Sequence, residues 1–315
     1  MNIFVDGHCD SLEVAFDKNI SIYNNDLSFN VKDALKNLPF IQFLASFIQT
    51  KYDTGNVAFK RVNDLLDKFY LEYEKNKDDM YLITSKDDLN KEKLNNKLGI
   101  ILTIENGVAL SNDLSNLEKL YNRGIRVMSL TWNDDNFLGC GAKTKNDTGI
   151  TKEGIKCIEK MEKLGIILDV SHASRKTFFD AIKISTKSII ATHSCVYNLC
   201  ENDRNLTDEQ IKLIAKSKGV IGVCLYNKFL SNKKIATIDE VINHIEYISN
   251  LVGTEYVGIG SDFDGIDKTD IAQGITGVID IRNIEEKLKL RGFSKEEVWN
   301  IMGGNYIRVL NENLK

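Results

Sequence analysis

The 315-residue chain is 43% hydrophobic and 27% charged, a normal balance for a folded protein, and its net charge of -4 offers no basic surface for nucleic acid. No stretch approaches the roughly 20 apolar residues of a membrane-spanning helix. The first apolar run is three residues long and ends in an acid, which does not fit a signal peptide. We therefore expect a cytoplasmic protein without nucleic-acid or membrane partners, whose six scattered cysteines form no disulfide framework.

Short apolar runs, typical of buried parallel strands, alternate with longer amphipathic segments along the chain. The predicted strands cover residues 3–6, 81–84, 99–104, 125–131, 165–171, 188–193, 220–226 and 256–261. An amphipathic helix is predicted over 61–69, and capping boxes predict helix starts at 207–210 and 294–297. About eight strand–helix units, without a glycine-rich phosphate loop, favour a closed (β/α)8 TIM barrel over an open doubly wound sheet.

The segment from about residue 17 to 80 is too long for a simple connection between two barrel elements. It predicts a helical excursion over one end of the barrel. The whole chain, residues 1–315, is then a single barrel domain.

Polar residues close the predicted strands. They are His8 and Asp10 on the first strand, then Glu105, His172, His193 and Asp262 on later ones. Because the carboxyl ends of parallel barrel strands meet on one face, we expect these side chains to lie together. A strand repeats every two residues, so His8 and Asp10 should point the same way, as should Asp6, which either supports a ligand or only caps the interior. The fourth histidine, His244, falls within a predicted helix and is expected to be structural.

Imidazole and carboxylate are the ligands that zinc takes in proteins. Three histidines, one aspartate and one glutamate are more than a single catalytic zinc uses, so a pair of ions bridged by one carboxylate fits the count better. Such a pair activates water, and hydrolysis of a stable bond is its natural use. Each residue also has a structural alternative, as a helix-entry residue, a core histidine or a turn carboxylate, but their joint position at one end of the barrel favours the metal.

In chain order, the motifs DGHCDSL, TIENG, LTWN, LDVSHAS, ATHS, DRN, GIGSDFDG and GGNYIRVL resemble the signature of the membrane dipeptidase (renal dipeptidase) family of zinc peptidases. The resemblance runs from about residue 3 to 311. It implies a metal-dependent amidohydrolase-type barrel with two zinc ions bridged by a water or hydroxide. By position it implies that one zinc is held by His8 and Asp10, the other by His172 and His193, and that Glu105 bridges them.

The resemblance also assigns the substrate side of the site. It implies that Asp262 is the catalytic acid and base, and that Arg204 of the DRN motif binds the substrate carboxylate. The implied substrate is a small dipeptide, with a D-residue tolerated at its carboxyl-terminal position. A homodimer is also compatible with the resemblance.

One position departs from the family pattern. Animal members have a substrate-contacting histidine after the strand that contains residues 127–131, where this chain has Trp132 followed by Asn133. An indole N–H can only donate, so Trp132 does not replace an imidazole, and Asn133 is a candidate for the missing polar contact.

Two other functions stay open from the sequence. The metals could act on a cyclic amide, a lactone or an N-acyl amino acid, in which case a substrate without a free carboxylate would be indifferent to Arg204. The chain could also be a non-catalytic barrel that binds a peptide or a metal, although such a protein has no need of Asp262.

Overall fold

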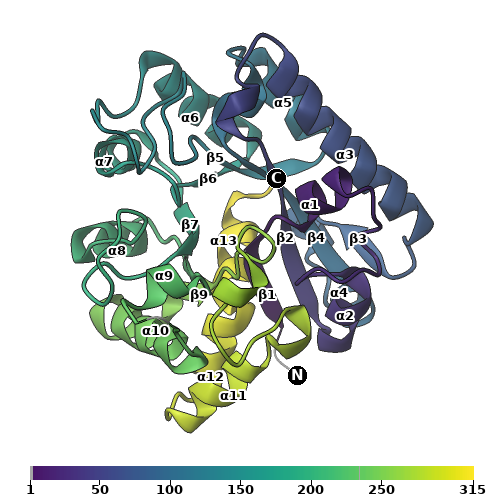
Figure 1. The fold of residues 1–315 in the computed structure, drawn as a ribbon, viewed down its shortest axis with the longest axis vertical. Helices are drawn as coiled ribbons and strands as arrows, with labels where there is room; N and C mark the ends of the chain where they lie inside the picture. The colour runs from purple at the N-terminus through teal and green to yellow at the C-terminus, as the bar shows by residue number, and fades with distance from the viewer. Residues whose placement is uncertain (1–2, 234) are drawn as a thin grey trace.

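Parallel strands close into a barrel at the centre of the computed structural model, which describes residues 3–233 and 235–315 (Figure 1). The strands are β1 (Phe4–Cys9), β2 (Phe40–Phe47), β3 (Met80–Leu82), β4 (Leu98–Glu105), β5 (Ile125–Ser129), β6 (Ile167–Asp169), β7 (Ile189–Ser194), β8 (Ile221–Val223) and β9 (Val257–Ile259). Their order is β2-β1-β9-β8-β7-β6-β5-β4-β3, and pairing of β2 with β4 closes a ring of eight. The short strand β3 pairs with the start of β4, outside this ring. The predicted (β/α)8 barrel is confirmed.

Helices surround the ring of strands (Figure 1). The α-helices are α1 (Ser11–Asp17), α2 (Val31–Ala34), α3 (Val57–Lys75), α4 (Lys91–Asn96), α5 (Ser115–Asn122), α6 (Lys152–Leu164), α7 (Arg175–Ile184), α8 (Asp208–Lys216), α9 (Asn227–Leu230), α10 (Ile238–Val252), α11 (Asn283–Leu290), α12 (Lys295–Trp299) and α13 (Asn305–Asn313). Short 3-10 turns are η1 (Leu35–Asn37), η2 (Thr50–Tyr52), η3 (Lys86–Asp88), η4 (Gly107–Leu110), η5 (Thr254–Tyr256), η6 (Lys268–Asp270) and η7 (Val278–Asp280), and η8 (Asn300–Gly304) is a π-helical turn. Both predicted capping boxes are present, at the starts of α8 and α12. None of the helices in the described residues combines the length and apolar character needed to cross a membrane.

The prediction of a helical excursion over residues 17–80 is wrong in one respect. The segment does contain α2 and α3, but between them lies β2, a full member of the barrel that pairs with both β1 and β4. Its sequence, FIQFLASF, is a short apolar run, and such a run has the same hydrophobic pattern in a buried strand and in a buried helix. The strand predicted at 81–84 is β3, which lies outside the ring. The barrel therefore has the predicted number of strands, but β2 takes the place that was predicted for β3.

Two hydrophobic clusters divide the core. The larger one lies between the barrel and its helices, and the smaller one fills the barrel interior. Tyr306 of α13 belongs to the interior cluster, where its ring packs 5.3 Å from that of Phe43. The Tyr306 side chain lies so close to Gly7, Gly222 and Gly258 that a Cβ atom on any of them would collide with it. Glycines on three strands therefore make room for the side chain that fills the barrel beneath the strand ends.

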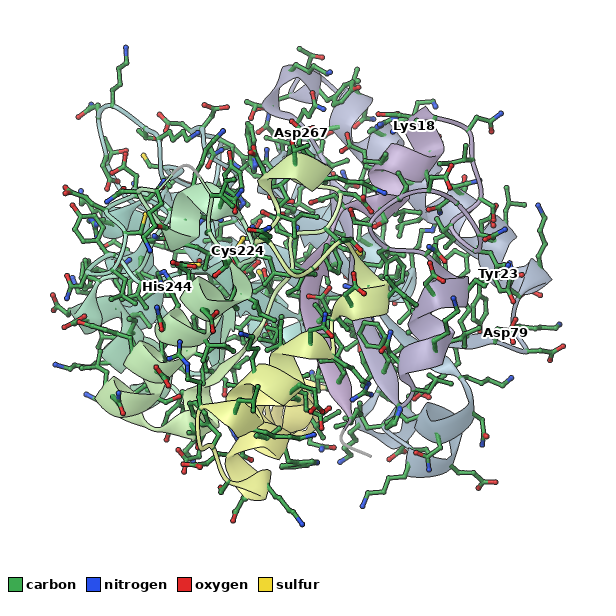
Figure 2. The ribbon with its side chains drawn as sticks, turned by 60° about the horizontal axis from the view of Figure 1, so that its bottom comes forward. Lys18, Tyr23, Asp79, Cys224, His244 and Asp267 are labelled. Carbon is green, nitrogen blue, oxygen red and sulfur yellow. The ribbon has the colours of Figure 1, made fainter. Side chains whose placement is uncertain are left out.

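His244 and the cysteines have the structural roles expected of them. His244 lies on α10 (Figure 2), where Nδ1 accepts from the Val196 amide at 3.0 Å and Nε2 donates to the Leu230 carbonyl at 3.0 Å. All six cysteines are free and buried.

Candidate metal centre

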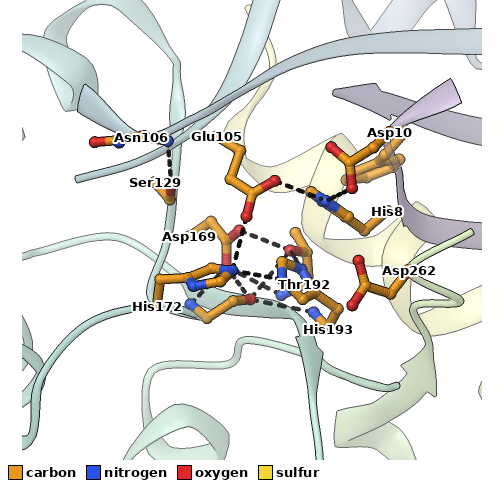
Figure 3. Close-up of polar contacts among 12 residues, drawn as sticks. His8, Asp10, Glu105, Asn106, Ser129, Asp169, His172, Thr192, His193 and Asp262 are labelled. Carbon is orange, nitrogen blue, oxygen red and sulfur yellow. Dashed lines mark hydrogen bonds and ion pairs between the residues drawn. The ribbon is translucent and has the colours of Figure 1, made fainter. Parts of the chain in front are cut away.

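The first group of polar side chains gathers at the end of β1. His8 Nε2 lies 3.2 Å from Asp10 Oδ2 and 3.1 Å from Glu105 Oε2 (Figure 3). The pairing of β1 with β2 shifts register between Asp6 and Cys9, so strict two-residue alternation does not hold through this strand. His8 and Asp10 nevertheless converge, because Asp10 follows the strand as the residue that precedes α1.

A second group adjoins the first and shares Glu105 with it. His172 Nε2 lies 2.7 Å from Glu105 Oε1 and 2.9 Å from His193 Nε2. The two oxygens of the Glu105 carboxylate thus face different groups, Oε2 towards His8 and Oε1 towards His172 (Figure 3). All five residues are buried, with at most 6% of the residue surface exposed. The structure therefore brings together the five predicted ligand residues from β1, β4, β7 and the end of β6.

Hydrogen bonds behind the histidines fix which ring nitrogen faces the centre. His172 Nδ1 lies 3.1 Å from Asn133 Oδ1, and an amide oxygen only accepts, so the ring proton is on Nδ1. His193 Nδ1 lies 2.9 Å from Thr192 Oγ1, whose own proton goes to Asp169 Oδ2 at 2.6 Å. His193 therefore also carries its proton on Nδ1. In both rings the unprotonated Nε2 points into the centre.

Two of the three histidines are held in the neutral form that a metal ligand requires. Burial, with the charge of Arg204, lowers the pKa of His172 well below its usual value, and burial, with the charge of His8, does the same for His193. Two neutral Nε2 lone pairs and one oxygen of Glu105 thus converge without a proton between them. Asp10 Oδ1, also buried, has no hydrogen-bond partner among the described residues. These donors fit one or more metal ions with imidazole and carboxylate ligands.

Asp262 lies beside this centre at the start of the DFDG turn. Its backbone is left-handed, with φ at 62°, and its N–H donates to the His8 carbonyl at 3.1 Å. Burial, then the charges of Asp10 and Glu105, raises the pKa of Asp262 to about 7, although His8 and Arg204 act against this rise. A Cβ atom on Gly265 would collide with the carboxylates of Asp10 and Asp262, so only glycine allows the turn to approach both.

Arg204 and Trp132, two of the candidates for substrate binding, line a cavity of about 540 Å³ over the centre. Arg204 is 3% exposed, its Nη2 donates to the His193 carbonyl at 3.3 Å, and its Nε and Nη1 have no partner among the described residues. Trp132 packs against Phe47, with ring centroids 5.2 Å apart, and its ring lies 6.2 Å from that of His172. Asn133 also lines the cavity, but its amide oxygen is engaged by His172.

Asp6 does not touch a ligand side chain. Its carboxylate accepts from the Ser261 N–H at 2.7 Å, from Ser261 Oγ at 2.6 Å and from Gln42 Nε2 at 2.8 Å. Its one contact with His8 is with the backbone N–H, at 3.4 Å. Of the two expectations for Asp6, the structure therefore favours the second, that it caps the interior, where it links β1 to β2 and to the residue Ser261 after β9.

Sequence reasoning missed the residues behind the histidines. Asp169 and Thr192 are polar residues inside apolar strands, each close before a ligand candidate in LDVSH and ATH, and that pattern is a signal for buried hydrogen bonding. Gln42, Phe47 and Gln49 were missed with β2, the strand that carries or precedes them.

The barrel and its histidine–carboxylate centre at the strand ends define a metal-dependent hydrolase. The model of the membrane dipeptidase family, peptidase family M19, matches residues 1–315, and the chain belongs to this family. The predicted family is thereby confirmed.

Individual relatives agree with this assignment. An uncharacterized dipeptidase of Schizosaccharomyces pombe is 30% identical over 288 residues, which cover 85% of this chain and 68% of the relative. Dipeptidase 3 of Mus musculus is 29% identical over 280 residues, 86% of this chain, and the match spans only 55% of that protein. The crystal structure of a metallo peptidase from Rhodobacter sphaeroides, liganded with a phosphinate mimic of L-Ala-D-Ala, shares the fold with a TM-score of 0.89 at 20% identity over 99% of this chain and 100% of that one.

The position of Asn133 gives a testable prediction. Asn133→Ala removes the acceptor that holds the His172 ring, so zinc affinity should fall by about 10- to 100-fold, as with other residues that orient a metal ligand. Zinc affinity is measured by competition with a chromophoric chelator, beside KM for a dipeptide. A raised KM with unchanged zinc affinity would instead make Asn133 a substrate contact, as the sequence suggested.

Proposed function

We propose that this protein is a binuclear zinc dipeptidase that tolerates a D-residue at the carboxyl-terminal position of its substrate. The observation that carries the proposal is the placement of Glu105, whose two oxygens face two adjoining groups of ligand atoms. One group consists of Glu105 with His8 and Asp10, and the other consists of Glu105 with His172 and His193. A carboxylate shared in this way suits a bridge between two ions.

The chemistry follows from the residues around that bridge. Bound zinc would supply Lewis acidity and lower the pKa of water, which is what hydrolysis of a peptide bond requires. Asp262, close to both groups and with a pKa raised to about 7, is suited to accept a proton from the attacking water and pass it to the leaving amine. Its burial against Gly265 holds the carboxylate at the centre rather than in solvent.

Arg204 and the cavity support a dipeptide as the substrate. The guanidinium group is buried and lines the cavity, and its Nε and Nη1 have no hydrogen-bond partner among the described residues, so these donors are available to a substrate carboxylate. A volume of about 540 Å³ accommodates a small molecule of dipeptide size. The Rhodobacter sphaeroides metallo peptidase binds a mimic of L-Ala-D-Ala, which supports the tolerance for a D-residue proposed here.

The function is tested with zinc-loaded protein and a panel of L,L and L,D dipeptides. We expect hydrolysis of both series, and no turnover by fully metallated protein would contradict the proposal. Arg204→Ala should reduce kcat/KM for dipeptides by about 10- to 100-fold, the range for a lost hydrogen bond to a charged group. The same change should have little effect on a dipeptide whose carboxylate is amidated.

The control is Arg175→Ala, because Arg175 contacts Gln210 and Tyr197 rather than the cavity. Equal activity of the wild type and Arg204→Ala on free dipeptides would favour the second enzymatic candidate, in which the substrate is a cyclic amide, a lactone or an N-acyl amino acid.

A further inference from the structure

Glu13 is an acidic residue of the cavity that the proposed reaction does not use. It lies on α1, directly after β1, and lines the cavity together with Phe47, Gln49 and Trp132. Only 7% of its surface is exposed. A carboxylate is rarely buried to this extent without a cationic or hydrogen-bonding partner.

The protein itself pairs this carboxylate weakly. Glu13 Oε1 lies 3.5 Å from Gln49 Nε2 and 3.6 Å from Arg61 Nη2. The same Nη2 is only 2.5 Å from Asp17 Oδ1, so Arg61 pairs chiefly with Asp17. Glu13 Oε2 contacts no donor among the residues that the structure describes. The cavity wall therefore presents an acidic group whose best donor is engaged elsewhere. Burial, then the charges of Asp10 and Asp17, raises the pKa of Glu13 to about 7, and a cationic ligand beside it would favour the charged form.

Glu13 and Arg204 lie on different sides of the metal centre. Glu13 follows β1 and Arg204 follows β7, and two strands, β9 and β8, separate β1 from β7 around the barrel. In the proposed function, Arg204 binds the carboxylate of the second residue and the scissile carbonyl lies at the centre between them. The first residue of the dipeptide then extends towards the wall formed by Glu13.

We infer that Glu13 selects dipeptides whose amino-terminal residue carries a cationic side chain, lysine or arginine. The inference rests on the proposed dipeptidase function. Glu13 is the cavity residue that would contact the side-chain cation, and Phe47 and Trp132 beside it offer apolar surface to the methylene stem of a lysine.

The test compares lysyl-alanine with norleucyl-alanine, a substrate that keeps the stem and lacks the charge. The wild type should have a kcat/KM for lysyl-alanine about tenfold or more above that for norleucyl-alanine, the effect of one charge-assisted contact. In Glu13→Gln this ratio should fall to about 1. Glu209→Gln is the matched control, because it is the same chemical change at an exposed acid on α8 that neither lines the cavity nor contacts Arg61, and it should keep the wild-type ratio.

Two results would overturn the inference. The first is a wild type that shows no preference for lysyl-alanine over norleucyl-alanine, a result that does not depend on whether the variants fold. The second is a Glu13→Gln variant with the same ratio of kcat/KM values as the wild type, since Glu13 would then act on both substrates alike. Failure of the proposed function looks different, because the wild type would then hydrolyse neither dipeptide.

Discussion

Replacing His172 with alanine is expected to reduce bound zinc from the two ions proposed here to about one per chain and to lower kcat by more than about 10³-fold. His172 Nε2 lies 2.7 Å from Glu105 and 2.9 Å from His193, so its removal leaves one of the two ligand groups with a single histidine. Loss of one ion removes part of the stabilisation of the developing oxyanion, and a single lost donor to an oxyanion already costs about 10²–10³ in rate. Zinc is counted by atomic emission on protein freed of loose metal, and kcat is measured on the same sample.

The control for this change is His244→Asn. His244 is equally buried but lies on α10, and an asparagine oxygen can replace its Nδ1 as the acceptor of the Val196 N–H. This variant should keep two zinc ions and most of the activity, whatever it loses in stability. A His172→Ala protein that retains both ions and near-normal kcat would remove His172 from the ligand set.

Replacing Asp262 with asparagine is expected to lower kcat by about 10²–10⁴-fold while the two zinc ions proposed for the centre remain bound. Asparagine has nearly the same shape as aspartate but cannot take up a proton. In the wild type the pKa of Asp262 is raised to about 7 by burial and by the charges of Asp10 and Glu105, which suits a group that accepts and returns a proton near neutral pH. Rate and zinc content are compared between the two proteins.

Asp267→Asn serves as the control, because Asp267 is an exposed acid on the rim of the same cavity (Figure 2). It should leave kcat within about twofold of the wild type, as surface substitutions usually have small effects. If Asp262→Asn instead loses zinc, Asp262 is a ligand, which its position beside His8 and His193 would allow. If it keeps more than a tenth of kcat with both ions bound, another group moves the proton.

Much of the centre could be predicted from the sequence because the barrel imposes one geometric rule. Residues that end parallel strands meet at one face, so Glu105, at the end of an apolar run, and His193, near the end of another, could be placed together without coordinates. The rule held for His8 and Asp10 even though the register of β1 shifts between Asp6 and Cys9. What mattered was that both residues come at the strand end, not that they alternate strictly.

Other features could not be predicted because they depend on contacts between distant segments. The run FIQFLASF is compatible with a buried helix or a buried strand, and only its pairing with β1 and β4 makes it β2. Asn133 was named as a candidate polar contact for the substrate, and the structure adds a contact that the sequence did not indicate, between its amide oxygen and a histidine 39 residues away. The single domain, the homodimer and the cytoplasmic location stay predictions from the sequence.

The sequence by itself determined the barrel, the family and the residues that end the strands, because apolar runs, turn residues and motif order are local properties of the chain. Only the tertiary structure decided how the two oxygens of Glu105 divide between two ligand groups, which nitrogen of each histidine faces the centre, and that Glu13 lines the cavity. These features are set by distances of about 3 Å between atoms far apart in the chain, and such distances arise only when the closed sheet brings its strand ends together.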